Sequence, residues 1–169
     1  MLSKRLNDEF NKQIMYEFYS AQLYLAMAAW AEANDFPGLS NFMVVQGEEE
    51  RFHAMKFFRY IAEAGGDIEI FGLDQPEFQA ESIMDIFASS YKHEQFVTSR
   101  IYTLMDIAQE EKDYAAISFL NWFVDEQMEE EASFDALIKK VKLIGENGNG
   151  LYQLDKELAS RVFTPPAAN

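Results

Sequence analysis

The spacing of glycine and proline constrains the fold of this chain more than any other feature. Its 169 residues include only 8 Gly and 4 Pro, which occur in clusters. This distribution predicts long helices separated by a few turns. Neither residue occurs between Glu77 and Ile144, a span too long for one helix, so a break is expected inside it. We place that break at 109–113, where charged residues cluster and the apolar stripe shifts out of phase.

Three further signals complete a helical outline. Pro37 follows a short turn and suits the first turn of a helix, which Gly65 and Gly66 then end. Ser82 and Asp85 have the spacing of an N-terminal capping box. The predicted helices cover residues 5–33, 37–64, 82–110, 113–144 and 150–162.

The lengths of the connections predict the topology. The first and third connections are short and favour antiparallel neighbours. The second has about 16 residues, enough at about 3.3 Å each to run along a helix of about 42 Å. We therefore expect one all-α domain: a four-helix bundle over residues 1–145 with a long crossover that makes its second and third helices parallel. Residues 146–169 add a short C-terminal helix and a tail to the same domain.

Charge and composition exclude several classes of partner and chemistry. With 29 Asp and Glu against 14 Lys and Arg, the formal charge is −15, which repels nucleic acids and acidic membrane surfaces. The absence of Cys excludes disulfides, thiolate metal sites and thiol nucleophiles. The charged N-terminus lacks the apolar run of a secretory signal, and the longest uncharged run, 18–31, is shorter than the roughly 20 residues that span a bilayer. We expect a cytoplasmic protein that binds neither nucleic acid nor membrane.

Each of the four long helices carries one glutamate where its apolar stripe calls for a core residue. Counting a rise of 1.5 Å per residue puts all four near the middle of their helices, within about 10 Å of one level. Burying unpaired carboxylates costs several kcal/mol each, and no Lys or Arg occupies an inward position. Two divalent cations would balance the four charges. The residues are Glu17, Glu50, Glu94 and Glu130.

A histidine adds a nitrogen ligand to this set. Glu50-x-x-His53 points two side chains from one helix face at the same site. Oxygen-rich ligation with one nitrogen suits iron or manganese, and charge does not separate the two. Tyr24 lies on the stripe of Glu17, where a place beside the metals and an ordinary core role are both open. His93 lies about 100° around the helix from Glu94, so we expect a surface or packing role.

Several motifs together carry a resemblance to a known family. They are Glu17, Glu50-x-x-His53, Tyr-Lys-His-Glu94, Gln127-x-x-Glu130, and the segment from Gly150-Leu151-Tyr152 to Asp155-Lys156-Glu157-Leu158. Over essentially its full length the chain resembles a ferritin of the prokaryotic non-haem type, within the ferritin-like di-iron four-helix bundles. The resemblance implies a dinuclear iron ferroxidase centre. In it Glu17, Glu50 and His53 hold one iron, Glu50 bridges, Glu94 and Glu130 hold the other, and Gln127 lies beside the second iron.

The resemblance also implies a function and an assembly. Members oxidise Fe(II) with dioxygen or hydrogen peroxide and store the Fe(III) mineral inside a hollow homo-oligomeric shell of 24 subunits. Tyr24 would supply a further electron or order the site, and the helix at 150–162 would pack at a symmetry axis. The alternative is a di-iron or manganese redox enzyme on the same bundle without storage, which would need a substrate pocket.

Departures from neighbouring families narrow the resemblance. Bacterioferritins and rubrerythrin-like proteins carry a second Glu-x-x-His on the fourth helix, where this chain has Gln127-x-x-Glu130. Phe52 stands where bacterioferritins have the Met that binds haem, so no haem is expected. The Cys pairs of a rubredoxin-like module are also absent.

Three more carboxylates predict a third iron site. Glu49, Glu126 and Glu129 each precede a centre residue by one position, which rotates them by about −100° around their helices. Because the crossover makes these two helices antiparallel, the three carboxylates turn to the same flank of the pair. The resemblance includes such a site towards the cavity. The alternative is an ordinary acidic surface facing the mineral.

Overall fold

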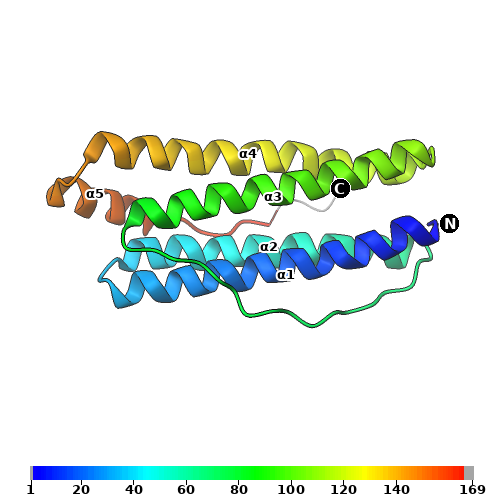
Figure 1. Ribbon diagram of the computed structural model, residues 1–169, viewed down its shortest axis with the longest axis horizontal. Coiled ribbons are helices and arrows are strands. Elements are labelled where there is room, and N and C mark those ends of the chain that lie inside the picture. Colours follow the sequence, from blue (N-terminus) through cyan, green and yellow to red (C-terminus); the bar gives the residue numbers. More distant parts are fainter. Residues whose placement is uncertain (1, 166–169) are drawn as a thin grey trace.

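The computed structural model describes residues 2–165 and, within them, contains five α-helices and no strand (Figure 1). This confirms the all-α class and the number of helices. The last residues of the expected 146–169 segment, from 166 onwards, lie outside the described part. The helices are α1 (Lys4–Ala33), α2 (Pro37–Glu63), α3 (Ile83–Glu110), α4 (Tyr114–Ile144) and α5 (Gly148–Leu158).

The four long helices form the bundle that the connection lengths predict. Figure 1 shows α1 and α2 running antiparallel, followed by a coil that returns along the whole bundle before α3 begins. As a result α2 and α3 are parallel, whereas α2 and α4 are antiparallel. The break between α3 and α4 falls at residues 111–113, where Lys112 adopts a positive φ of 56°. No helix of residues 2–165 combines the length and apolarity that a membrane crossing requires.

Side-chain caps explain where the helices begin. Ser82 accepts a hydrogen bond from the backbone N–H of Asp85, and the Asp85 carboxylate accepts from Ser82 Oγ and from the backbone N–H of Glu81. Ser3 and Asp113 cap α1 and α4 in the same manner. These polar residues satisfy backbone donors that the first helical turn leaves unpaired.

The N-terminus of α2 is capped from another helix. Its N-cap residue, Phe36, provides no side-chain hydrogen bond. Instead the carboxylate of Asp155 in α5 accepts from the backbone N–H of Gly38 at 3.0 Å and of Leu39 at 2.8 Å. An anion at a helix N-terminus is favoured by both the free N–H groups and the helix dipole, so Asp155 fixes α5 against α2.

The fifth helix differs from the expected range of 150–162. It starts two residues earlier because Asn147 caps it, accepting from the backbone N–H of Gly150. It ends at Leu158 because the Asn41 amide donates hydrogen bonds to the backbone carbonyl groups of Ala159 and Arg161, at 3.3 and 3.0 Å. The helix packs against α2 and α4. A symmetry-axis contact for this helix stays a prediction.

Two apolar clusters fill the bundle, one on each side of a polar layer. In α1, Ile14 belongs to one cluster and Leu23 to the other, with Glu17 between them. In α4, Phe123 and Phe134 flank Glu130 in the same way. The polar layer therefore lies in the middle of the bundle, at the level that the count of helical rises predicts.

Candidate metal centre

The polar layer contains one glutamate from each long helix. None of the four is more than 6% exposed, although ionised carboxylates are rarely buried without a partner. No ion pair between the four and a Lys or Arg is found among residues 2–165. The arrangement thus carries negative charge that the described part of the chain does not balance with its own Lys or Arg. The four are Glu17, Glu50, Glu94 and Glu130.

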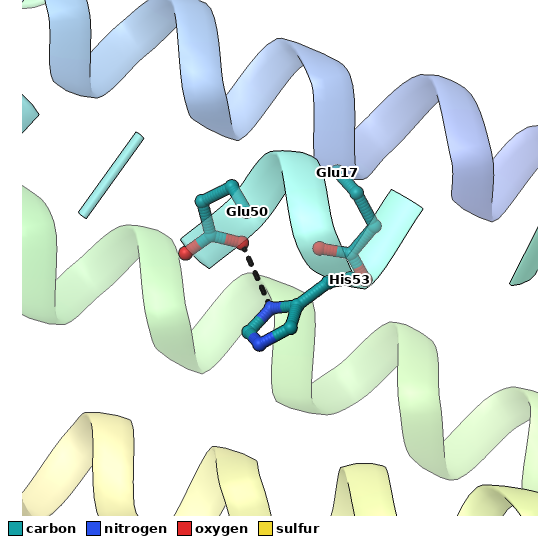
Figure 2. Close-up of side chains that lie close together, drawn as sticks. All are labelled: Glu17, Glu50 and His53. Atoms are coloured by element: carbon teal, nitrogen blue, oxygen red, sulfur yellow. Dashed lines mark hydrogen bonds and ion pairs between the residues drawn. The ribbon is translucent and has the colours of Figure 1, made fainter. Parts of the chain in front are cut away.

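Three side chains form the tightest part of the layer. Figure 2 shows Glu17 reaching from α1 towards Glu50 and His53, which come from one face of α2. One potential ligand atom from each of the three lies within 4.8 Å of the others. His53 Nδ1 lies 3.3 Å from Glu50 Oε2, as the i, i+3 spacing on a helix allows. The sequence predicted this juxtaposition from the spacing alone.

Glutamine amides donate hydrogen bonds to three of the buried carboxylates. Gln46 Nε2 donates to Glu130 Oε2 at 2.9 Å and to Glu50 Oε1 at 3.3 Å, so it links α2 to α4. Gln127 Nε2 donates to Glu94 Oε2 at 3.1 Å, which links α4 to α3. Amide donors stabilise a carboxylate without adding charge and leave its other lone pairs available.

Two supporting glutamines, Gln13 and Gln46, were missed by the sequence analysis. Gln13 donates to Glu17 Oε1 at 2.9 Å and, like Gln46, lies four residues before the glutamate that it supports. A glutamine one helical turn before each centre glutamate of α1 and α2 was therefore the signal that could have found them.

One oxygen of the centre lacks any partner. Glu17 Oε2 is buried without a hydrogen bond, although Oε1 of the same carboxylate has one from Gln13. Burying an acceptor without a partner costs free energy. In native proteins an ion, a water molecule or a functional role usually accounts for such an atom. Here the atom belongs to the cluster with Glu50 and His53, so a cation is the fitting partner.

Burial and mutual repulsion set unusual pKa values for the acids. Burial, followed by the charge of Glu50, raises the pKa of both Glu17 and Glu130 to about 8. The same two causes raise the pKa of Glu94 well above its usual range. Without a cation these three acids favour the neutral form. Divalent cations would reverse that preference by favouring the carboxylates.

Glu50 and His53 behave as a pair of opposite charges. Burial opposes ionisation of Glu50, but the hydrogen bond and charge of His53 outweigh it and lower the pKa of Glu50. Burial likewise opposes protonation of His53, yet hydrogen bonds to Glu126 and Glu50 raise the pKa of His53 well above its usual range. Without a metal, the positive charge of the imidazolium partly offsets the negative charge of Glu50; with a cation bound, His53 would serve as a neutral imidazole ligand.

Tyr24 joins the centre directly, whereas His93 does not. The Tyr24 hydroxyl donates to Glu94 Oε1, and its ring stacks on Phe134 with centroids 6.0 Å apart. His93 Nε2 lies 2.7 Å from Ser20 Oγ, and its ring packs against Tyr24. This agrees with the packing role expected for His93.

The three outer carboxylates are less closely grouped. Glu126 Oε1 lies 3.7 Å from His53 Nε2, whereas Glu129 is exposed. Glu49 forms an ion pair with Arg161, a residue that the sequence analysis did not consider. Among residues 2–165, Glu17, Glu50 and His53 form the only group of three or more such side chains whose ligand atoms all lie within 4.8 Å of one another, so Glu49, Glu126 and Glu129 do not form a group of that kind.

Comparisons with known proteins point to one family. The Ferritin family model, described as a ferritin-like domain, matches residues 7–144. A bacterial non-heme ferritin of Staphylococcus aureus (strain MRSA252) is 44% identical over 163 residues, covering 96% of this chain and 98% of the relative. One of Staphylococcus saprophyticus is 45% identical with the same coverage. An engineered closed form of the Archaeoglobus fulgidus ferritin superposes with a TM-score of 0.95 at 43% identity, covering 97% of this chain and 100% of that one.

Proposed function

This chain belongs to the ferritin family, so its function is iron storage with oxidation of Fe(II), and we propose that the buried glutamate layer is the ferroxidase centre. The single observation that carries this proposal is the cluster of Glu17, Glu50 and His53, in which Glu17 Oε2 has no partner. The cluster lies between two apolar regions where an unbalanced charge is expensive.

The residues divide into two iron sites that share one ligand. Glu17 and His53 hold the first iron, Glu94 and Glu130 hold the second, and Glu50 bridges them. This assignment gives two divalent cations for four carboxylates, with one imidazole nitrogen, and such an oxygen-rich set suits Fe(II). Gln127 lies beside the second iron through its hydrogen bond to Glu94. Haem is not expected, because Phe52 packs on Trp122 and Phe163 where a haem-binding Met would stand.

The protein contributes placement, charge balance and exclusion of water. Two Fe(II) supply the two electrons that, with two protons, convert dioxygen to hydrogen peroxide or hydrogen peroxide to two waters. Burial by the two apolar clusters keeps bulk water away from the reacting atoms. The Tyr24 hydroxyl bonds to Glu94 and would order the second site or supply a further electron.

A third iron site beside the centre extends the proposal. Glu126 is 3.7 Å from His53, so a carboxylate from the proposed outer set already adjoins the inner one. Glu49 and Glu129 would complete the set with an oxygen ligand each. If these carboxylates form only an ordinary acidic surface, the protein binds no third ion with a defined affinity.

Storage requires an assembly, and we propose the hollow 24-subunit homo-oligomer of the family. Support comes from the match of nearly the whole chain to ferritin structures, including a humanized archaeal ferritin with a TM-score of 0.95 at 44% identity. The alternative, a di-iron or manganese redox enzyme, needs a substrate pocket at the centre. The 690 Å³ cavity between α1, α3 and the crossover is lined by Tyr16, Tyr19 and His93, and by none of the four buried glutamates.

Light scattering combined with iron analysis separates the two functions. We expect a large assembly that accumulates far more iron than its metal sites can hold when Fe(II) is added in air. The Glu50→Ala variant should assemble equally well but load iron slowly. A small oligomer that retains only a fixed pair of metals would support the enzyme alternative.

A further inference from the structure

Arg161, just beyond α5, connects the C-terminal segment to the centre. Its Nη1 donates to Gln46 Oε1 at 2.7 Å, and its Nη2 pairs with Glu49. The other end of the Gln46 amide donates to Glu130 and Glu50. A single guanidinium therefore contacts one residue that supports the inner iron sites and one carboxylate of the proposed third site.

We propose that Arg161 is a positioning residue. It orients Gln46 towards the inner iron sites and competes with the third iron for Glu49. The proposal rests on the proposed function, because both sites belong to it. It assigns two separable roles to one side chain. The planar guanidinium of Arg161 orients the amide of Gln46, and its positive charge pairs with the carboxylate of Glu49.

The first role follows from the two ends of an amide. Because Gln46 Oε1 accepts from Arg161, its NH₂ group must face the carboxylates of Glu130 and Glu50. A flipped amide would point its oxygen at two carboxylates and its NH₂ at a guanidinium. Arg161 thus selects the one orientation that supports the inner sites.

The second role follows from charge. Arg161 neutralises Glu49, and both side chains are largely withdrawn from solvent, with 24% and 22% exposed. A cation that binds Glu49 must displace the guanidinium or share the carboxylate with it. The ion pair therefore weakens the third site relative to the inner ones, so that the inner sites fill first.

The position of Arg161 is built rather than accidental. Asp155 fixes α5 on the first turn of α2, and Asn41 holds the backbone carbonyl of Arg161 at 3.0 Å. The guanidinium also lies over the Phe42 ring, 4.1 Å from its centroid. Three residues of α2 thus contact the Arg161 side chain, and a fourth, Asn41, holds its backbone.

Anaerobic calorimetric titration of the metal-free protein with Fe(II) tests both roles without turnover. For Arg161→Gln we expect third-ion binding to tighten about threefold or more, because a competing charge is lost, while the second ion binds more weakly. Arg161→Lys retains the charge without the fork, so it should restore the wild-type third-site affinity but not the second-ion affinity. Gln46→Ala should weaken the second ion alone.

Matched controls keep the outcomes distinct. Arg59→Gln makes the same charge change at an exposed position of α2 and should match the wild type. Misfolding would lower the stoichiometry of every site together, whereas we expect opposite shifts in two affinities. If Arg161→Gln and Arg59→Gln both match the wild type, Arg161 positions nothing. If no protein binds a third ion but all bind two, competition for Glu49 and the third site are both overturned. In that case the ferroxidase centre stands.

Discussion

Gln127 in α4 donates a hydrogen bond of 3.1 Å to Oε2 of Glu94 in α3. Its NH₂ group also lies 3.3 Å from the backbone carbonyl of Glu94, so the amide fixes both the side chain and the helix that carries it. The position holds a neutral donor where bacterioferritins and rubrerythrin-like proteins carry the glutamate of their second Glu-x-x-His. In the proposed ferroxidase centre, Gln127 would therefore tune the second iron site through Glu94.

Replacing Gln127 by Leu should selectively weaken binding of the second iron. The hydrogen bond favours the charged form of Glu94, and such bonds to charged groups contribute about 1.5–3 kcal/mol. We expect about tenfold weaker binding of the second Fe(II), with the first ion unaffected, in anaerobic titration. Equal affinities in the variant and the wild type would remove Gln127 from the centre.

Tyr24→Phe should separate packing from chemistry at the centre. The stacked ring on Phe134 is retained, while the hydrogen bond to Glu94 is lost. We expect slower Fe(II) oxidation in stopped-flow absorbance with a thermal midpoint within a few degrees of the wild type. Tyr60→Phe removes a hydroxyl in the other apolar region and should leave the rate unchanged. Equal rates in all three proteins would make Tyr24 a packing residue.

The metal-free protein should lose stability as pH rises. Glu17 and Glu130 have folded pKa values of about 8, above the ordinary 4.5, so the folded state retains protons that the unfolded chain releases. This stabilisation is fully present below pH 4.5 and is lost as pH rises through about 8. Calorimetry of metal-free protein should show a midpoint that falls between pH 5 and 8.

Two substitutions identify the source of that slope. Glu17→Gln mimics the neutral acid and should reduce the pH dependence, leaving the part that Glu130 contributes, whereas Glu63→Gln, at an exposed position of α2, should leave it intact. A midpoint that rises over this pH range in metal-free protein would show that the glutamate layer is not buried as described.

Asp155→Ala should loosen the attachment of α5 to α2. Its carboxylate caps α2 at Gly38 and Leu39, and loss of an N-cap costs about 1 kcal/mol before the packing of α5 is counted. We expect a lower thermal midpoint and faster amide exchange at both backbone N–H groups. Glu157→Ala, which removes an exposed partner of Lys140, is the control. Identical exchange in the two variants would contradict a capping role for Asp155.

The sequence predicted what periodicity and chain length control. Glycine and proline spacing bounded α1 and α2, clustered charges and a phase shift of the apolar stripe located the break between α3 and α4, and the crossover length predicted parallel α2 and α3. The centre could be found because a glutamate in an apolar stripe conflicts with its surroundings. That conflict is visible at Glu17 without any structure.

Interactions that depend on tertiary placement could not be predicted in the same way. The early end of α5 depends on Asn41, which lies more than a hundred residues away in α2. Gln46 reads as an ordinary polar residue until its two carboxylate partners are seen. Arg161 follows a helix whose docking the sequence does not define, so its contact with Glu49 had no sequence signal.

The most direct test of the central claim is an anomalous difference map at the iron edge, from crystals soaked anaerobically in Fe(II). We predict two peaks per subunit, one among Glu17, Glu50 and His53 and one among Glu50, Glu94 and Glu130. Crystals of Glu50→Ala should lose or weaken both peaks, since this residue joins the two sites. Iron peaks confined to other positions, with this glutamate layer free of iron, would contradict the account.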